Sequence, residues 1–252
     1  MQIRVINLDR SQDRLAAFMS TNAHLTAVSR FSAIDGRKLD LAKLVRAGVI
    51  GDGLLHKDYY TIGAIGAAMS HLSLWEEAAD AGTMLTIAED DAIFHSRFEA
   101  HAAEVIGQLP PDWDLILWGW NFDLFLCFEM LPGISLSLSQ FEQDRLRVHA
   151  ARFRDLSVVP RPFRLLWSFG IPCYTVTSKG ARALKALSLP LKPSIASFPP
   201  ATRTPLRAQH FRNVGIDSAM NNAYAKINAH VCFPPLVITK NERATSTIQE
   251  GP

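Results

Sequence analysis

Short apolar runs alternate along this chain with segments whose apolar residues recur at helical spacing. The apolar runs lie at residues 3–8, 30–34, 84–88, 115–118 and 171–177. The segments with helical spacing lie at residues 65–79, 98–109, 178–187 and 220–227. Short apolar runs are typical of buried strands, and their alternation with helices is typical of sheets covered by helices on both faces. The chain is therefore predicted to be an α/β protein with a mostly parallel central sheet flanked by helices.

Length and composition fit one globular domain. Of its 252 residues, 48% are hydrophobic and 20% are charged, a balance that excludes a disordered chain. No internal repeat or linker divides the sequence, so we expect a single domain over residues 1–252. The 26 basic and 24 acidic residues leave a net charge of +2, which is too small to predict nucleic acid as a partner.

Neither a membrane span nor a secretory signal is predicted. The most apolar stretch, residues 115–128, is shorter than the roughly 18 residues that cross a bilayer, and it contains Asp123. The first ten residues already carry charge and lack the apolar core of a signal peptide. The three cysteines, Cys127, Cys173 and Cys232, match neither a disulfide framework nor a zinc site by spacing. We therefore expect a soluble protein in a reducing compartment.

Three consecutive carboxylates, Glu89-Asp90-Asp91, follow the apolar run 84–88 directly. Ligands of open α/β sheets bind beyond the carboxyl ends of strands, and adjacent carboxylates repel one another unless a cation neutralises them. In an extended backbone Glu89 and Asp91 face the same way, and Asp90 faces the other. Such a pair suits Mg²⁺ or Mn²⁺ with substrate phosphates. An acidic surface turn is the alternative, and these residues alone leave both interpretations open.

Small residues dominate the segment Gly63–His71, which begins a predicted helix. Small residues at a helix start let a ligand approach the backbone, and the free N–H groups there favour phosphate. Tight packing of a buried helix explains the same residues, and their spacing alone favours that alternative. Ser70 and His71 do not indicate a hydrolase, because helical neighbours point about 100° apart and no Gly-x-Ser-x-Gly motif is present.

Asp217 and three tryptophans each have a structural and a functional interpretation. Asp217 precedes the last predicted helix, where it would serve as an N-cap or, beside a site, as a general base. Trp118, Trp120 and Trp167 would pack in the core, the usual place for tryptophan, or stack on a sugar ring.

Arginine is frequent in the middle of the chain. Six arginines occur within residues 143–164, and Arg203, Arg207 and Arg212 follow. A basic rim that attracts a phosphorylated acceptor and a solvated loop both remain open for these residues.

Taken in order, these segments resemble glycosyltransferase family 25, which contains lipopolysaccharide and lipooligosaccharide galactosyltransferases and their collagen-modifying relatives. The resemblance runs over most of the chain. It is carried by residues 5–14, 30–36, 60–78, 87–94, 112–119, 171–184 and 215–217, and by 234–237 with 245–248. The chain departs from the family pattern in the signature helix, where Ala64 replaces an acid and Ala67 a cysteine. Residues 120–170 match poorly, so we expect this variable segment on the acceptor side.

The resemblance implies a GT-A-like fold, a nucleotide-sugar donor such as UDP-galactose, and a divalent cation, Mn²⁺ or Mg²⁺. It implies that Glu89, Asp91 and Asp90 supply the metal ligands. Inversion at the sugar carbon requires a base, for which Asp217 is the first candidate and Asp90 the second. For donor binding it points to a further set of residues: Arg10, Arg14, Asp35, Gly63, Ser70 and His71.

The predicted function is transfer of a sugar, galactose from UDP-galactose, to a glycan or glycolipid in lipopolysaccharide or lipooligosaccharide biosynthesis. The resemblance places such an enzyme in the cytoplasm or, as a peripheral protein, at the cytoplasmic face of the inner membrane. Two alternatives remain: a catalytically silent relative that binds a glycan or nucleotide, and a metal-dependent phosphoesterase. The acidic triad argues against the first, and the lack of a second, histidine-rich cluster argues against the other.

Overall fold

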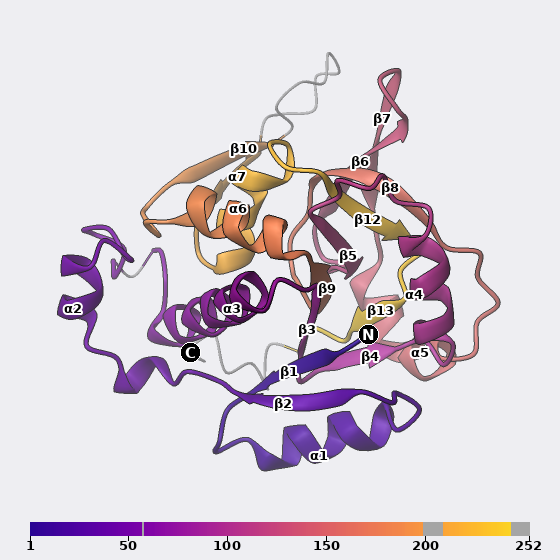
Figure 1. Cartoon of the computed structure of the whole chain (residues 1–252), viewed down its shortest axis with the longest axis horizontal. Helices are drawn as coiled ribbons and strands as arrows, with labels where there is room; N and C mark the ends of the chain where they lie inside the picture. Colours follow the sequence, from indigo (N-terminus) through magenta and orange to yellow (C-terminus); the bar gives the residue numbers. More distant parts are fainter. Residues whose placement is uncertain (57, 199–208, 243–252) are drawn as a thin grey trace.

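A nine-stranded sheet forms the centre of the molecule (Figure 1). The computed structural model describes residues 1–56, 58–198 and 209–242. The strands follow the order β2-β1-β3-β9-β5-β12-β8-β6-β7. Their bounds are β1 Ile3–Asn7, β2 Val28–Ser32, β3 Leu85–Glu89, β5 Leu115–Gly119, β6 Phe125–Leu131, β7 Ser135–Gln140, β8 Arg161–Trp167, β9 Cys173–Val176 and β12 Ala229–Phe233.

The sheet is mixed, and the prediction of a mostly parallel sheet is wrong. Three neighbouring pairs are parallel, namely β1 with β2, β1 with β3, and β5 with β12. The remaining pairs are antiparallel, because β9 enters between β3 and β5 in the opposite direction and β6, β7 and β8 extend the sheet as antiparallel neighbours. The apolar pattern of a strand reports burial but not direction, so the sequence contained no signal for this arrangement.

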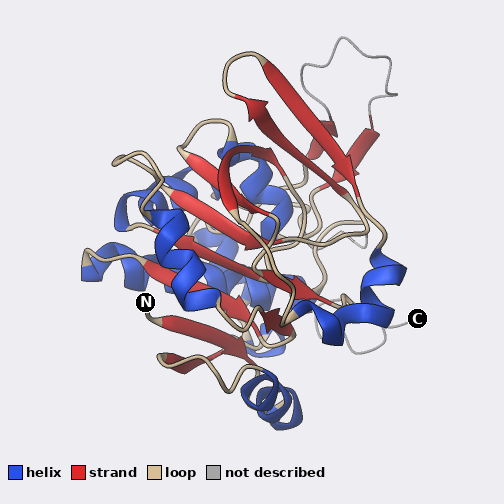
Figure 2. Ribbon diagram, turned by 90° about the vertical axis from the view of Figure 1, so that its right-hand side faces the viewer, coloured by secondary structure: helices blue, strands red, loops and turns tan. Residues whose placement is uncertain are grey.

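Helices cover both faces of the sheet, as predicted (Figure 2). In β5, Leu115 and Leu117 join the apolar cluster under α3 (Ile62–Ala81), α6 (Ser178–Ser188) and α7 (Ile216–Tyr224). Ile116 and Trp118 point to the other face and join a cluster with Phe18 of α1 (Gln12–Thr21) and with α4 (Phe98–Ile106). This alternation is the period of two that a strand buried on both faces requires.

The capping residues of α3 explain where the helix begins and ends, and its apolar face explains how it packs. Thr61 begins it, because its hydroxyl accepts a hydrogen bond from the amide of Ala64 at 3.0 Å. Gly82 ends it in the left-handed conformation, with φ of 67°, which glycine adopts without steric cost. The buried residues Ile65, Leu72 and Trp75 fix it against the sheet. The helix predicted from this segment is confirmed.

Shorter elements complete the fold. They are η1 Gly36–Lys38, α2 Leu41–Arg46, β4 Ala92–Phe94, α5 Gln143–Phe153, β10 Ile195–Phe198, β11 Gln209–Arg212 and β13 Val237–Thr239. β4 pairs with β13, and β10 pairs with β11. Five prolines between residues 190 and 205 predict a loop there, whereas the structure forms strand β10 within it. Residues 199–205 lie outside the described residues. None of the helices in the described ranges has the length and apolar character that crossing a bilayer requires.

The tryptophans and cysteines lie in the core. Trp118, Trp120 and Trp167 are at most 4% exposed, which confirms core packing rather than a sugar-stacking surface. All three cysteines are buried and free.

The glycine at position 66 is required by packing within the chain. A Cβ atom there would lie 2.5 Å from the carbonyl oxygen of Ile34 and 2.6 Å from the amide nitrogen of Gly36. Small residues in this helix thus bring the segment before η1 against α3, which is the structural interpretation of the Gly63–His71 segment.

Gly66→Ala is expected to lower the free energy of unfolding by about 1–3 kcal/mol, because backbone atoms must move to admit the methyl group. Chemical denaturation measures the change. The control is Gly107→Ala, whose Cβ would meet no atom closer than 3.5 Å and whose φ is −63°, so its stability should not fall. Equal stability of Gly66→Ala and the wild type would contradict the packing argument.

Candidate active site

A cavity of about 340 Å³ opens at the carboxyl ends of β1 and β3. The loop before β9 and the first turns of α3 and α7 complete its wall. Every residue that the sequence predicted for the site lines this cavity: Arg10, Arg14, Asp35, Gly63, Ser70, His71, Glu89, Asp90, Asp91 and Asp217. The fold thus brings together residues that are more than 200 positions apart in the sequence.

Glu89 and Asp91 form a partly buried carboxylate pair at the end of β3. Burial raises the pKa of Glu89 well above its ordinary value, and the negative charges of Asp91 and Asp217 raise it further. Burial also raises the pKa of Asp91. One oxygen of Asp91, Oδ2, accepts a hydrogen bond from the Thr239 hydroxyl at 3.1 Å, whereas the buried Oδ1 has no hydrogen-bond partner among the described residues. The pair thus has unused acceptor capacity and an excess of negative charge.

Asp90 differs from Glu89 and Asp91 in its hydrogen-bond partners. Its Oδ1 accepts a hydrogen bond from Arg14 Nε at 2.9 Å, and its Oδ2 accepts one from Asn7 Nδ2 at 2.7 Å. Arg14 also forms an ion pair with this carboxylate. The extended backbone assumed for this strand end is not found, because β3 ends at Glu89 and both Asp90 and Asp91 lie in the turn that follows. The separate contacts of Asp90 therefore depend on this turn and not on strand alternation. Its contacts make Asp90 an anchor between β1, α1 and β3.

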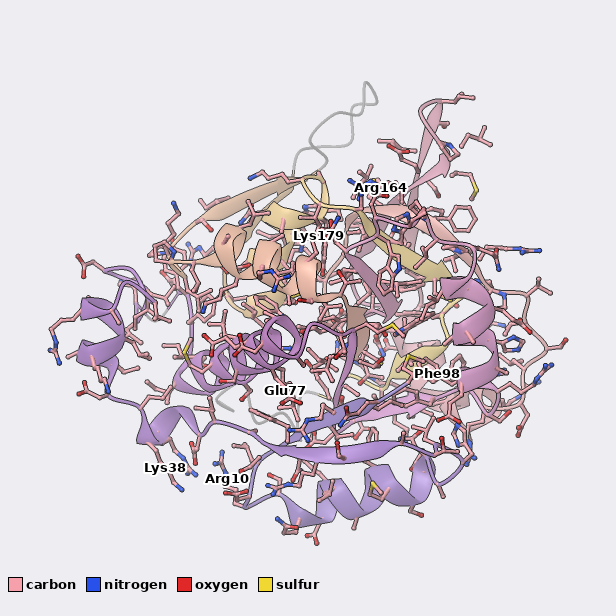
Figure 3. The ribbon with its side chains drawn as sticks, in the orientation of Figure 1. Arg10, Lys38, Glu77, Phe98, Arg164 and Lys179 are labelled. Carbon is pink, nitrogen blue, oxygen red and sulfur yellow. The ribbon has the colours of Figure 1, made fainter. Side chains whose placement is uncertain are left out.

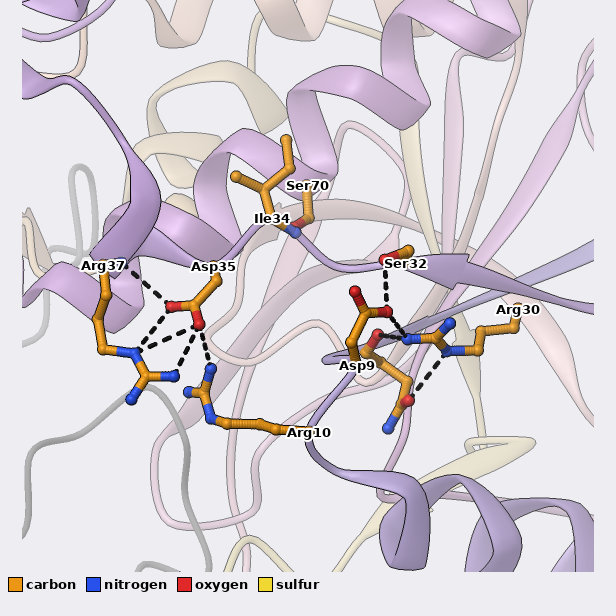
Figure 4. Close-up of polar contacts among 9 residues, drawn as sticks. Asp9, Arg10, Arg30, Ser32, Ile34, Asp35, Arg37 and Ser70 are labelled. Carbon is orange, nitrogen blue, oxygen red and sulfur yellow. Dashed lines mark hydrogen bonds and ion pairs between the residues drawn. The ribbon is translucent and has the colours of Figure 1, made fainter.

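Two arginines flank Asp35 at the outer wall of the cavity (Figure 4). Asp35 accepts hydrogen bonds from Arg10 Nη1 at 2.5 Å and from Arg37 Nη2 at 2.8 Å. The hydrogen bonds from Arg37, and after them the positive charge of Arg10, hold the pKa of Asp35 below its ordinary value. The wall therefore keeps a fixed negative charge between two cations.

The cavity-facing side of α3 carries Gly63, Ala67, Ser70 and His71. The hydroxyl of Ser70 donates to the carbonyl of Gly66 at 2.9 Å and accepts from the amide of Ile34 at 2.8 Å. Ser70 therefore ties the segment before η1 to α3 (Figure 4). His71 is buried, and its Nδ1 atom lies 2.8 Å from the Tyr174 hydroxyl.

Asp217 is the second residue of α7, and its interpretation as an N-cap is wrong. Gly215 occupies the cap position in extended backbone, so the helix begins one residue before Asp217. Asp217 Oδ1 accepts a hydrogen bond from the amide of Ser218 at 2.8 Å, and its Oδ2 accepts one from the amide of Gly170 at 3.0 Å. Burial raises the pKa of Asp217 above its ordinary value, which these hydrogen bonds partly offset.

Several residues at the site escaped the sequence analysis. Thr239 in β13 binds Asp91, Asn7 binds Asp90, and Tyr60 holds Gly215 with a 2.7 Å hydrogen bond to its carbonyl oxygen. Thr239 and Asp91 are 148 positions apart, so no local pattern relates them. Asn7 is the last residue of β1 and follows the mostly apolar run Ile3–Ile6, and this place at the carboxyl end of a buried strand was the available signal.

The arginines of the middle segment do not form one rim around the cavity. Arg147 donates to the carbonyls of Lys240 and Asn241, Arg161 donates to Gln108, and Arg164 donates to the carbonyls of Tyr224 and Ala229. Arg164 lies far from Arg10 in the view of Figure 3. Arg212 forms an ion pair with Asp58, and Arg203 and Arg207 lie outside the described residues.

The chain matches one family model, described as "Glycosyltransferase family 25 (LPS biosynthesis protein)", over residues 1–195. A Bos taurus protein named "Probable inactive glycosyltransferase 25 family member 3" is 30% identical over 130 residues, which are 47% of this chain and 21% of that protein. The Rattus norvegicus protein of the same name is 30% identical over 148 residues, 53% of this chain and 25% of that protein. An Aedes aegypti "Glycosyltransferase 25 family member" is 33% identical over 126 residues, which are 46% of this chain and 21% of that protein. The match thus spans about a fifth to a quarter of these curated relatives.

Two solved structures show a distant likeness. The crystal structure of A197 from STIV has a TM-score of 0.37 at 10% identity, covering 94% of this chain and 83% of that chain. A putative glucose-1-phosphate thymidylyltransferase from Bacillus anthracis has a TM-score of 0.34 at 10% identity, covering 74% of this chain and 75% of that chain. Neither likeness is close enough to support an inference.

Proposed function

The chain belongs to glycosyltransferase family 25, and from this premise we propose that it transfers galactose from UDP-galactose to a glycan or glycolipid acceptor in lipopolysaccharide or lipooligosaccharide biosynthesis. The observation that carries the proposal is the cavity itself, where the partly buried Glu89–Asp91 pair faces arginines and a helix start. We include in the proposal a GT-A-like fold and a location at the cytoplasmic face of the inner membrane, where a glycolipid acceptor would be reached.

The residues present fit a divalent cation. Mg²⁺ and Mn²⁺ are commonly bound by one or two carboxylates together with substrate phosphates. Glu89 and Asp91 provide two carboxylates, and Oδ1 of Asp91, which has no hydrogen-bond partner in the described ranges, provides an acceptor. In the described part of the chain, no three Asp, Glu, His or Cys side chains form a metal-binding group. We therefore propose Glu89 and Asp91 as the protein ligands, without Asp90, and expect the diphosphate to supply others.

The chain's own residues have separate roles in the proposed reaction. A bound divalent cation offsets the negative charge that grows on the departing diphosphate. Arg10 and Arg14 keep positive charge at the cavity wall, beside Asp35 and Asp90, where the nucleotide and its phosphates would bind. Asp217 is the proposed base that takes the proton of the acceptor hydroxyl, which an inverting transfer requires.

A catalytically silent family member is the second candidate. It is favoured by the word "inactive" in the names of two relatives and by Ala64, which stands where the family pattern has an acid. The two candidates make the same prediction for donor binding and differ in transfer.

UDP is expected to bind much more tightly with Mn²⁺ than without a divalent cation, because the diphosphate alone adds negative charge beside Glu89 and Asp91. Isothermal titration calorimetry with UDP, first in Mn²⁺ and then in EDTA, measures this difference. Equal affinity in both buffers would contradict the metal assignment. A following assay with UDP-galactose and oligosaccharide acceptors separates the candidates: transfer supports the enzyme, binding alone supports the silent relative, and donor hydrolysis alone supports a phosphoesterase.

A further inference from the structure

Three buried side chains form a chain of hydrogen bonds beneath the cavity. Trp75 Nε1 lies 2.7 Å from the Tyr174 hydroxyl, and the same hydroxyl lies 2.8 Å from His71 Nδ1. Trp75 and Tyr174 are fully enclosed, and His71 is 2% exposed. The imidazole also stacks on the Tyr174 ring, with centroids 5.8 Å apart.

The chemistry of these groups determines where each hydrogen atom lies. The indole Nε1–H of tryptophan only donates, so the Tyr174 oxygen accepts from Trp75. The single hydroxyl hydrogen of Tyr174 then has His71 Nδ1 as its acceptor. The hydroxyl of Tyr224, another buried group near Tyr174, has no hydrogen-bond partner among the described residues and gives no alternative. An imidazole that accepts at Nδ1 carries its hydrogen on Nε2.

Burial also keeps this imidazole uncharged. It lowers the pKa of His71 to about 3, because loss of water disfavours the charged ring. His71 is therefore neutral at physiological pH, and its Nε2–H is a hydrogen-bond donor without a positive charge.

The position of His71 on α3 gives this donor a direction. Gly63, Ala67 and His71 follow at intervals of four residues on one helical face, and all three line the cavity. The ring edge that carries Nδ1 faces Tyr174 in the core. The opposite edge, which carries Nε2, is left for the cavity. Gly63, which has no side chain, and the small methyl group of Ala67 leave room in front of it.

We propose that His71 is fixed as the neutral Nε2–H imidazole by Tyr174 and Trp75, and that this Nε2–H donates a hydrogen bond to an oxygen of the bound nucleotide sugar. The inference rests on the proposed function for the identity of the ligand. It makes His71 a binding donor rather than a base, since its accepting nitrogen is already used. Tyr174 is a positioning residue, which acts through His71 and touches no substrate.

The first test is a nitrogen NMR spectrum of the histidine rings in the ligand-free protein, with the His71 signals identified by their loss in His71→Phe. We expect one neutral form with the hydrogen on Nε2 and a hydrogen-bonded Nδ1. In Tyr174→Phe, the Nδ1 resonance should move to that of a nitrogen without a hydrogen bond, and the Nδ1–H form should appear beside the other. Tyr224→Phe is the matched control, because it removes a buried hydroxyl to which no described residue is hydrogen-bonded.

The second test is calorimetric binding of UDP and UDP-galactose in Mn²⁺. His71→Phe should weaken binding roughly tenfold, as loss of one hydrogen bond does, and Tyr174→Phe should weaken it by a smaller factor. Tyr224→Phe should bind like the wild type. If His71→Phe weakens the binding of both ligands, the acceptor oxygen belongs to the UDP portion. If it weakens the binding of UDP-galactose alone, the acceptor oxygen belongs to the sugar.

The outcomes separate this inference from the proposed function. A charged or Nδ1–H imidazole in the wild type overturns the inference, and so does an unchanged spectrum in Tyr174→Phe. Wild-type protein that binds the donor, with His71→Phe binding equally well, overturns the role of His71 alone. Wild-type protein that binds neither compound contradicts the role of His71 and the proposed function together, while the spectrum still reports on the Tyr174 contact.

Discussion

Asp91→Asn is expected to slow sugar transfer by roughly 10²–10³-fold, the loss typical when one electrostatic contact to a developing charge is removed. Asp91 is partly buried in the turn after β3. Its Oδ2 accepts from Thr239, and its Oδ1 has no hydrogen-bond partner within the part of the chain that the structure describes. An asparagine amide is a poor substitute for a carboxylate beside a divalent cation. The variant should also bind UDP more weakly in Mn²⁺. In EDTA it should bind UDP at least as well as the wild type, because one negative charge beside the diphosphate is gone.

The fold should tolerate this substitution. The asparagine side-chain oxygen can still accept from the Thr239 hydroxyl, and the change removes one negative charge beside Glu89. The free energy of unfolding in EDTA should therefore not fall. Asp155→Asn, the same change at an exposed acid after α5, is the control and should leave transfer and binding unaltered. Normal transfer by Asp91→Asn would exclude Asp91 as a metal ligand.

The strands and their buried faces could be predicted because each depends on local apolar pattern. Leu115 to Trp118 contains no polar side chain, and the structure buries these residues on both faces of β5. Strand direction could not be predicted in this way. β9 lies between β3 and β5 because residues 120–170 lead the chain back to the centre of the sheet. The residues of β9, Cys173–Val176, contain no signal for that position or direction.

The set of residues around the cavity could be predicted, whereas their contacts could not. The acidic triad, the Gly63–His71 segment and Asp217 were recognisable from their places beside predicted strands and helices, and Arg10, Arg14 and Asp35 came from the family resemblance. Asp90 is held by Asn7, 83 positions away, and Ser70 by Ile34, 36 positions away. Such distant partners depend on how β1, β3 and α3 pack, and packing has no short-range signal in a single sequence. The roles of these residues therefore stay predictions for experiment.

Asp217→Asn is expected to reduce transfer by roughly 10²–10⁴-fold, because it removes the carboxylate proposed to take the acceptor proton. The contacts of Asp217 complicate the experiment. Both of its oxygens accept backbone N–H groups, from Gly170 and Ser218. Asparagine can accept with only one of them and turns an NH₂ group toward the other. We therefore expect a stability loss of about 1–3 kcal/mol in addition to the rate effect.

A second variant separates the lost base from a displaced loop. Asn221, one turn later in α7, anchors the same loop by accepting from the Ser168 amide at 2.9 Å and donating to the Ser168 carbonyl at 2.6 Å. Asn221→Ala should lower stability by a similar amount, since it frees the loop while the carboxylate of Asp217 stays in place. Transfer is compared at a temperature where wild type and both variants are folded, with donor binding in Mn²⁺ measured alongside. If Asp217 is the base, Asp217→Asn loses transfer far more than Asn221→Ala while both bind UDP. Equal losses in the two variants would instead make Asp217 a residue that holds Gly170, and the proton acceptor would have to be another group at the cavity.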